Sequence, residues 1–164
     1  MAHLIIREFP DPALRKECEI IERMGAGTRQ FIENLAKKMY SEPGGIGIAA
    51  PQVGVMKKIA IVDVSRKVPG AKQLILINPV IEAVEDMGIS REGCMSLPHF
   101  TANVKRANKI RVRFQDINLK TQSMAASGIE AICIQHEVDH LNGLLFLDRV
   151  SCLKTDVFKR KKYL

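Results

Sequence analysis

The stretch Gln135-His136-Glu137-Val138-Asp139-His140 carries the strongest structural signal in this chain. In a helix, residues four apart lie on one face about 6 Å from each other, so His136 and His140 can coordinate one metal ion. Glu137 is rotated away from that face, too far to be a natural third ligand, yet near enough to hydrogen-bond a water on the metal. A Lewis acid beside a general base predicts metal-assisted hydrolysis.

The flanking residues predict that this stretch is a helix from Ser127 to about Leu141. Ser127-Gly128-Ile129-Glu130 fits the capping-box pattern, in which the serine hydroxyl and the glutamate each satisfy a backbone amide. Asn142-Gly143 offers a left-handed stop after the last apolar residue. A stripe of apolar residues is expected to face the core: Ile129, Ile132, Val138 and Leu141. The alternative is that two surface histidines match the pattern by chance.

Length and composition predict one soluble domain over residues 1–164, and the histidine motif described above predicts that this domain is catalytic. The chain has 164 residues, of which 46% are hydrophobic and 26% are charged, as is typical of globular proteins. It contains no apolar run of the roughly 20 residues needed to cross a bilayer. Its start lacks the basic-then-apolar layout of a signal peptide. We therefore expect a cytoplasmic protein with no membrane or DNA partner.

The net charge of +7 suggests affinity for something acidic. Much of the excess lies in Lys154 and in the run Lys159-Arg160-Lys161-Lys162. A solvated basic tail is the simpler interpretation, and contact with RNA is the functional one. No recognisable nucleic-acid motif accompanies the run.

The apolar pattern predicts an α+β fold with short, mostly antiparallel sheets around the central metal-binding helix. A helix capped by Thr28 is expected to carry an apolar side made of Phe31, Ile32, Leu35, Met39 and Tyr40. Strand-like runs cover residues 59–64, 74–77, 80–84 and 110–114. Residues 92–100 are expected to be irregular, residues 144–147 to form a short buried strand, and a final helix to run from about Ser151 towards the end.

A hydrolytic metal site usually has three protein ligands and one open position, so a third ligand is required. Four widely spaced cysteines are expected to be free or metal-bound thiols: Cys18, Cys94, Cys133 and Cys152. Cys133 shares the helix face with the histidines, but its short side chain lies a turn too early, so we interpret it as a core residue. Cys94 follows the permissive Gly93, and its thiolate is the favoured third ligand. The Met95 amide would then point near the same centre.

The glycine-rich segment Gly45-Ile46-Gly47-Ile48-Ala49-Ala50 fits the dinucleotide pattern G-x-G-x-x-A only on paper. That pattern needs a strand before it and a helix after it, whereas here a helix precedes it and Pro51 and Gly54 interrupt any following helix. The small residues instead predict exposed backbone that a peptide-like ligand can approach. Gln52 follows, and its amide can donate to a developing oxyanion. A plain tight-packing loop is the alternative.

Three segments together resemble one family, the peptide deformylases. They are Gly45-Ile46-Gly47-Ile48-Ala49-Ala50-Pro51-Gln52, Glu92-Gly93-Cys94-Met95-Ser96 and Gln135-His136-Glu137-Val138-Asp139-His140. They stand in the family's order with family-like spacing, and the likeness extends over essentially the whole chain.

The resemblance implies that Cys94, His136 and His140 are metal ligands and that Glu137 is the acid/base. One divalent ion per chain is expected, Fe²⁺ in the cell, with Zn²⁺, Ni²⁺ or Co²⁺ able to substitute. The implied substrate is the formylmethionine end of newly made polypeptides, near the ribosome exit. That location favours contact between the basic C-terminal segment and RNA.

The resemblance also implies substrate contacts. Gln52 and the Met95 amide would bind the substrate oxygen, and Gly47 would contact the substrate backbone. We further expect a small apolar pocket for the methionine side chain, lined by residues such as Ile46 and Val138.

Two positions depart from the family pattern. Met95 stands where the family commonly has leucine, and Thr101 stands where many bacterial members have arginine. The Thr101 region borders the substrate pocket, so the preference for substrate side chains stays open.

Glu92 is expected to pair with Arg106 and to steady the Cys94 segment. Asp139 would either orient a ligand from behind or lie exposed on the helix.

Two other functions compete with this one. A zinc metallopeptidase with spaced histidines needs a third histidine where Phe146 stands, and its other version needs a glutamate after Glu137 that the chain lacks. A structural metal module or RNA-binding accessory protein would need a fourth protein ligand. It would also leave Glu137 without a purpose.

Overall fold

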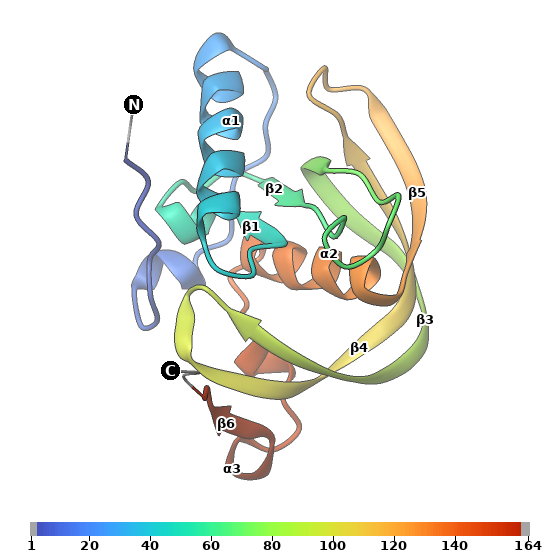
Figure 1. The fold of residues 1–164 in the computed structure, drawn as a ribbon. Helices are drawn as coiled ribbons and strands as arrows, with labels where there is room; N and C mark the ends of the chain where they lie inside the picture. The colour runs from blue at the N-terminus through green and yellow to red at the C-terminus, as the bar shows by residue number, and fades with distance from the viewer. Residues whose placement is uncertain (1–2, 162–164) are drawn as a thin grey trace.

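A long hairpin of two strands forms the largest part of the structure (Figure 1). The computed structural model describes residues 3–161. Strands β3 (Leu74–Cys94) and β4 (Leu97–Gln115) pair antiparallel and are joined by the two-residue turn Met95-Ser96. The hairpin curves around helix α2 (Gly128–Leu141), so it encloses the helix that carries the histidine motif.

The remaining strands extend this hairpin into one antiparallel sheet. Their bounds are β1 (Gly47–Ala49), β2 (Ile59–Val62), β5 (Thr121–Ser127) and β6 (Val157–Lys159). The sheet order is β1-β2-β3-β4-β5, and β6 pairs with the first part of β4. The expected α+β class is therefore confirmed. The separate strands predicted over 74–77 and 80–84 are one strand, and the strand predicted over 110–114 is the second half of β4.

Alternation along β4 explains how the sheet wraps the helix. Apolar side chains point inward and charged ones outward: Ala102, Val104, Ile110, Val112 and Phe114 are buried, whereas Lys105, Lys109, Arg111 and Arg113 are exposed. Successive residues of a strand face opposite sides of the sheet, so this pattern gives β4 one apolar face. That face packs against α2.

Helix α1 (Ala26–Ser41) packs on the β1–β2 side of the molecule. Its buried residues are Ile32, Leu35 and Met39, as the sequence pattern predicted. Gly25 rather than Thr28 is the N-cap residue, and Tyr40 is exposed. Short helices lie at η1 (Pro12–Arg15), η2 (Ala50–Val53), η3 (Phe146–Arg149) and α3 (Leu153–Asp156). Within residues 3–161, no helix is long and apolar enough to serve as a membrane span.

Helix α2 is buried on all sides from Cys133 to Leu141, so the expected one-sided apolar stripe is wrong. A helix enclosed by a sheet needs no polar face, provided that each polar side chain finds a partner. Ser127 is the N-cap residue as predicted, but its side chain makes no capping hydrogen bond. Gly143 does end the helix with a φ of +74°. A Cβ atom there would lie 2.7 Å from the backbone oxygen of Arg15.

Three predicted segments differ from the structure. Residues 92–100, expected to be irregular, contain the end of β3 and the start of β4. Residues 144–147 form no strand, because Phe146–Arg149 is a short helix. The expected final helix is limited to Leu153–Asp156, since Val157–Lys159 pairs with the free edge of β4. The end of that predicted helix, residues 162–164, lies outside the described residues.

Hydrogen bonds of the Gln135 side chain connect α2 to strand β4. Its side-chain oxygen accepts a hydrogen bond from the Ala107 amide at 3.0 Å, and its nitrogen donates to the Ala107 carbonyl at 2.8 Å. Strand β5 pairs with β4 only from Lys109 onward, so Gln135 takes the place of a strand partner at Ala107.

Replacing Gln135 with leucine is expected to destabilise the fold by about 2–3 kcal/mol, because two buried backbone groups lose their partner. Urea unfolding at matched metal content measures this change. The matched control is Gln30→Leu on the exposed side of α1, for which we expect a change within about 0.5 kcal/mol. Equal losses for the two variants would contradict this account of Gln135.

Candidate metal centre

The hairpin and the helix bring three metal-ligating side chains together. The candidate ligand atoms of Cys94, His136 and His140 all lie within 4.8 Å of one another, and all three residues are buried. Cys94 Sγ lies 3.3 Å from His140 Nε2. The strand register shifts between Gly93 and Cys94, directly before the turn, and an irregularity of this kind changes the direction of the side chains beside it. The donor set of one thiolate and two imidazoles fits a divalent transition metal.

Glu92 connects His136 to the sheet. Its carboxylate bonds His136 Nδ1 at 2.8 Å and accepts from Arg106 Nε at 2.8 Å and Nη2 at 3.1 Å. The expected Glu92–Arg106 pair is therefore confirmed. Because Nδ1 is occupied, Nε2 is the nitrogen that His136 offers to a metal.

Asp139 completes the same network from the helix. It accepts from Arg106 Nη1 at 2.6 Å and from Arg149 Nη2 at 2.9 Å. Asp139 is buried, so the alternative of an exposed helix position is wrong. It acts on the histidines through Arg106 and Glu92.

The buried groups around the three candidate ligands have pKa values shifted from their ordinary ones. Burial alone would raise the pKa of Glu92, but hydrogen bonds from His136 and Arg106 hold it below its ordinary value. Burial lowers the pKa of His140 well below its ordinary value. Burial also lowers the pKa of His136, yet hydrogen bonds with Cys94 and Glu92 outweigh it and raise that pKa well above the ordinary value. Since ligands must be unprotonated, a bound cation would replace this proton on His136.

Glu137 lies beside these ligands with an unsatisfied oxygen. It is only 4% exposed, and its Oε2 has no hydrogen-bond partner within residues 3–161. Burial raises its pKa to about 7. The absence of a side chain at Gly47 makes room for the carboxylate, because a Cβ atom there would overlap Glu137 Oε1 and lie 2.7 Å from Cys133 Sγ. Gly47 belongs to the buried strand β1 rather than to an exposed loop, which corrects the prediction.

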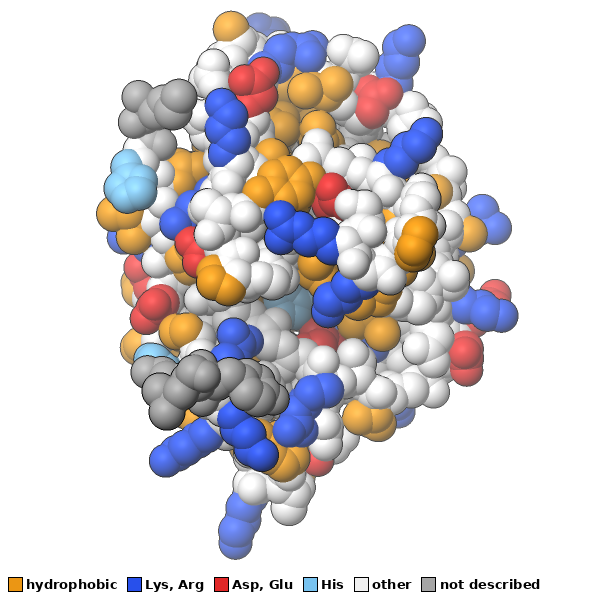
Figure 2. Space-filling view, in the orientation of Figure 1, with side chains coloured by type: hydrophobic (Ala, Val, Ile, Leu, Met, Phe, Trp, Pro, Cys, Tyr) orange, Lys and Arg blue, Asp and Glu red, His pale blue; other side chains and the backbone are white. Residues whose placement is uncertain are grey.

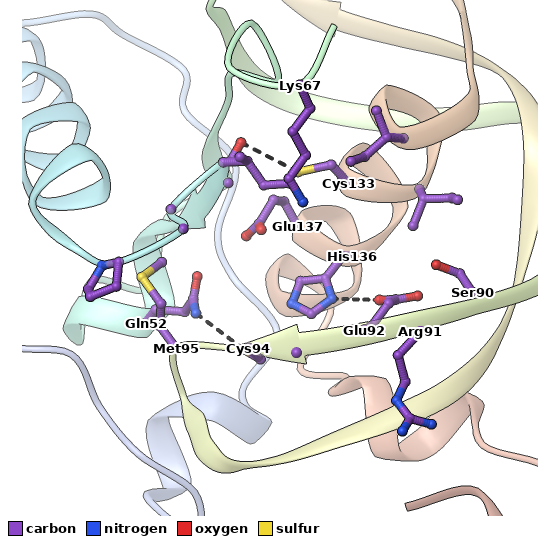
Figure 3. A pocket seen from close by; sticks show the side chains of 18 of the residues that line it. Gln52, Lys67, Ser90, Arg91, Glu92, Cys94, Met95, Cys133, His136 and Glu137 are labelled. Carbon is purple, nitrogen blue, oxygen red and sulfur yellow. Dashed lines mark hydrogen bonds and ion pairs between the residues drawn. The ribbon is translucent and has the colours of Figure 1, made fainter. Parts of the chain in front are cut away.

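Gln52 faces the same centre from η2. Its oxygen accepts from the Ala49 amide at 2.9 Å, which leaves its nitrogen 3.2 Å from Ser96 Oγ and 3.5 Å from Cys94 Sγ (Figure 3). The side-chain amide is therefore a donor held in a fixed orientation. Met95, in the turn after Cys94, lines the same pocket.

The pocket is a cavity of about 350 Å³ between α2, the end of β3 and the segment that leads into β1. Its apolar lining includes Ile46, Met95, Ile129, Ile132 and Cys133. Ile129 and Ile132 precede His136 at helical spacing, so the same sequence pattern that predicts a core-facing stripe also indicates the helix face that lines the pocket.

Of two sequence predictions for side chains of α2, the structure contradicts one and confirms the other. Val138 does not line the pocket, since it packs in the main core. Cys133 lies outside the ligand group, as expected, with Sγ 3.5 Å from the Ile46 carbonyl, and burial raises its pKa well above the ordinary value. Thr101, a departure from the family pattern, pairs with Phe158 of β6.

Known proteins match this chain over nearly its whole length. The sequence model described as polypeptide deformylase matches residues 3–156. The peptide deformylase of Thermodesulfovibrio yellowstonii is 41% identical, over 98% of this chain and 97% of its own length. Peptide deformylase 1 of Pseudomonas syringae is 44% identical, over 98% of this chain and 95% of its own length.

Solved structures agree with these sequence matches. The peptide deformylase from Synechococcus elongatus in complex with actinonin has a TM-score of 0.84 at 39% identity, over 93% of this chain and 82% of that one. The enzyme from Thermotoga maritima has a TM-score of 0.85 at 33% identity, over 93% of this chain and 100% of that one. The resemblance drawn from three motifs is thereby confirmed.

Glu92→Gln is expected to weaken metal retention about 10- to 100-fold, because it removes the negative charge that supports His136 and leaves Arg106 short of a partner. Competition with a chromogenic chelator measures the affinity. Glu82→Gln is the matched control, since Glu82 is also on β3 but pairs with Arg113 at the surface. An unchanged affinity in Glu92→Gln would rule out this supporting role.

Proposed function

The chain belongs to the polypeptide deformylase family and is a metal-dependent hydrolase that removes the formyl group from the N-terminal methionine of polypeptides, and we propose how its residues divide that work. The observation that supports the division is the meeting of Cys94, His136 and His140 beside the unpartnered carboxylate of Glu137. These groups come from elements that are far apart in the sequence. Three metal ligands beside a carboxylate that can carry a proton suit the hydrolysis of an amide bond.

Cys94, His136 and His140 would hold one divalent cation, which when bound supplies the Lewis acidity that brings the pKa of a water molecule towards neutrality. We propose ferrous iron as the metal in the cell, following the family resemblance, with zinc, nickel or cobalt able to substitute. A thiolate with two imidazoles suits these borderline metals.

Glu137 is the proton carrier in this proposal. Its Oε2 accepts the proton of the water that attacks the formyl carbon, and then delivers it to the amine that leaves. A pKa of about 7 suits both steps, because the group is close to half-protonated at neutral pH. Formate and a free amino terminus are the products.

Gln52 and the backbone amide of Met95 stabilise the oxyanion that forms on the formyl group. The Gln52 nitrogen is aimed at the centre because its oxygen is anchored to Ala49. A donor fixed before the reaction needs no reorganisation, and the loss of one such donor typically costs about 10²–10³ in turnover.

The substrate occupies the apolar cavity. We propose that the methionine side chain packs against Ile46, Ile129, Ile132 and Cys133, and that the backbone of Gly47 contacts the substrate backbone. A flexible thioether fits such an irregular apolar site.

We propose that the chain acts on new polypeptides in the cytoplasm, near the ribosome, as the family resemblance implies. Lys154, Lys159 and Lys161 are exposed and could meet RNA phosphates there. Lys162 of the same basic run lies outside the described residues.

A metallopeptidase is the less favoured function. Phe146, which stands where a third histidine would be needed, is buried, and its ring stacks near that of His136 with centroids 6.2 Å apart. The family matches also point to deformylation.

The purified chain is expected to release formate from formyl-Met-Ala-Ser, to lose this activity under chelation and to regain it when Fe²⁺ is added without oxygen. A coupled formate dehydrogenase assay measures release, and elemental analysis of anaerobically purified protein identifies the metal. Cleavage of unformylated peptides, without formate release, would instead favour the metallopeptidase.

Glu137→Gln is expected to lower kcat about 10²- to 10⁴-fold while metal content stays unchanged, because the amide cannot carry the proton. Glu130→Gln is the matched control on the same helix, since Glu130 does not line the pocket. Near-normal formate release by metal-loaded Glu137→Gln would show that another group carries the proton.

A further inference from the structure

The last strand brings a basic side chain to the mouth of the pocket. The Arg160 amide donates to the His99 carbonyl at 2.8 Å and so continues the pairing of β6 with β4. The guanidinium of Arg160 covers the backbone of Gly93, because a Cβ atom on Gly93 would overlap Nη2 and lie 3.2 Å from Cζ. The Arg160 side chain therefore contacts Gly93, the residue that directly precedes Cys94 in the chain.

Neighbouring residues at this sheet edge are also anchored to one another. Phe158 lies two residues before Arg160, and the Arg91 guanidinium stacks on its ring at 3.6 Å. Arg91 also donates to Asn103 Oδ1 at 3.0 Å. Lys159 alternates to the other side of the strand and does not line the pocket. The backbone of Arg160 is thus held against β4 directly after the end of β6.

The mouth of the pocket is cationic. Lys67, Arg91 and Arg160 line it from three separate segments. Within residues 3–161, none of the three forms a salt bridge, and the nearby Glu92 is already engaged by Arg106 and His136. Figure 2 shows basic side chains around a central hollow in which a histidine is visible. Glu137 also lines this pocket, but it is buried and forms no salt bridge with the three cations, so an acidic group that enters here would meet cations not yet engaged in an ion pair.

We propose that Arg160, with Arg91 and Lys67, selects substrates that carry acidic side chains directly after the formylmethionine. This inference rests on the proposed function, which places the formyl group at the metal centre. An extended peptide advances about 3.3 Å per residue, so its second and third residues leave the pocket past this cationic mouth. Arg160 is a specificity-determining residue in this scheme, and its guanidinium can bind a carboxylate with two hydrogen bonds.

The test compares C-terminally amidated peptides of the form formyl-Met-Xaa-Xaa, with Asp, Asn or Lys at both Xaa positions. We expect kcat/KM to be about three- to tenfold higher for Asp than for Asn, and lowest for Lys, because the charges meet in a partly exposed cleft. In Arg160→Gln the Asp/Asn ratio should fall towards one, and in Arg160→Lys it should be partly kept. The ratio is taken within each variant, so a general change in activity cancels.

Two controls separate this effect from nonspecific charge. Lys159→Gln removes the same charge from the neighbouring position and should keep the wild-type ratio. About 1 M salt, where the screening length is about 3 Å, should reduce the ratio in the wild type. Formyl-Met-Ala with a free or an amidated end shows whether a terminal carboxylate is recognised in the same way.

A wild-type Asp/Asn ratio near one, or a ratio that survives in Arg160→Gln, would overturn the proposal. Binding of fluorescent Asp and Asn peptides to the metal-loaded Glu137→Gln variant gives a second readout. Formate release that shows no charge preference would disprove only the role of Arg160 and would leave the proposed function standing. Arg160-dependent binding without any formate release would instead disprove the proposed function.

Discussion

The carboxylate of Glu92 bonds two partners at once, His136 on the enclosed helix and Arg106 on the opposite strand. Buried charges are costly unless each one is paired, so the hairpin and α2 must meet in the register that satisfies all of them. Arg106 extends the constraint to Asp139, three residues after His136 on the same helix. Cys94 lies two residues beyond Glu92, just past a shift in the strand register, and its thiol lies beside His140.

The enclosure of α2 also sets the electrostatics of the pocket. Because the sheet surrounds the helix, Glu137 is buried without a hydrogen-bond partner for Oε2, and its pKa rises to about 7. Basic side chains gather at the open side instead, where β6 brings Arg160 against Gly93. The pocket thus has a buried carboxyl group at its base and basic side chains along its open side, the arrangement from which we infer a preference for acidic residues after the formylmethionine.

Several sequence predictions were wrong because contacts between segments distant in the chain outweigh the local sequence pattern. Val157–Lys159 has the local pattern of a helix end, but it forms a strand because the edge of β4 at Phe100–Ala102 lies beside it. Residues 92–100 looked irregular because a glycine, a proline and a tight turn interrupt the alternation, although both flanks belong to long strands. Val138 could not be separated from the pocket by periodicity, since the helix is buried all round.

By itself the sequence determined the helix that carries His136 and His140, its end at Gly143, and the chemistry that made Cys94 and Gln52 candidates. The 3.6-residue repeat and the demands of a metal act over short stretches or on residue type, so a single chain records them. Only the tertiary structure decided the pairing of Glu92 with His136, the burial that shifts Glu137, and the place of Arg160 at the mouth. Those features depend on distances and desolvation between segments far apart in the chain, which no local pattern encodes.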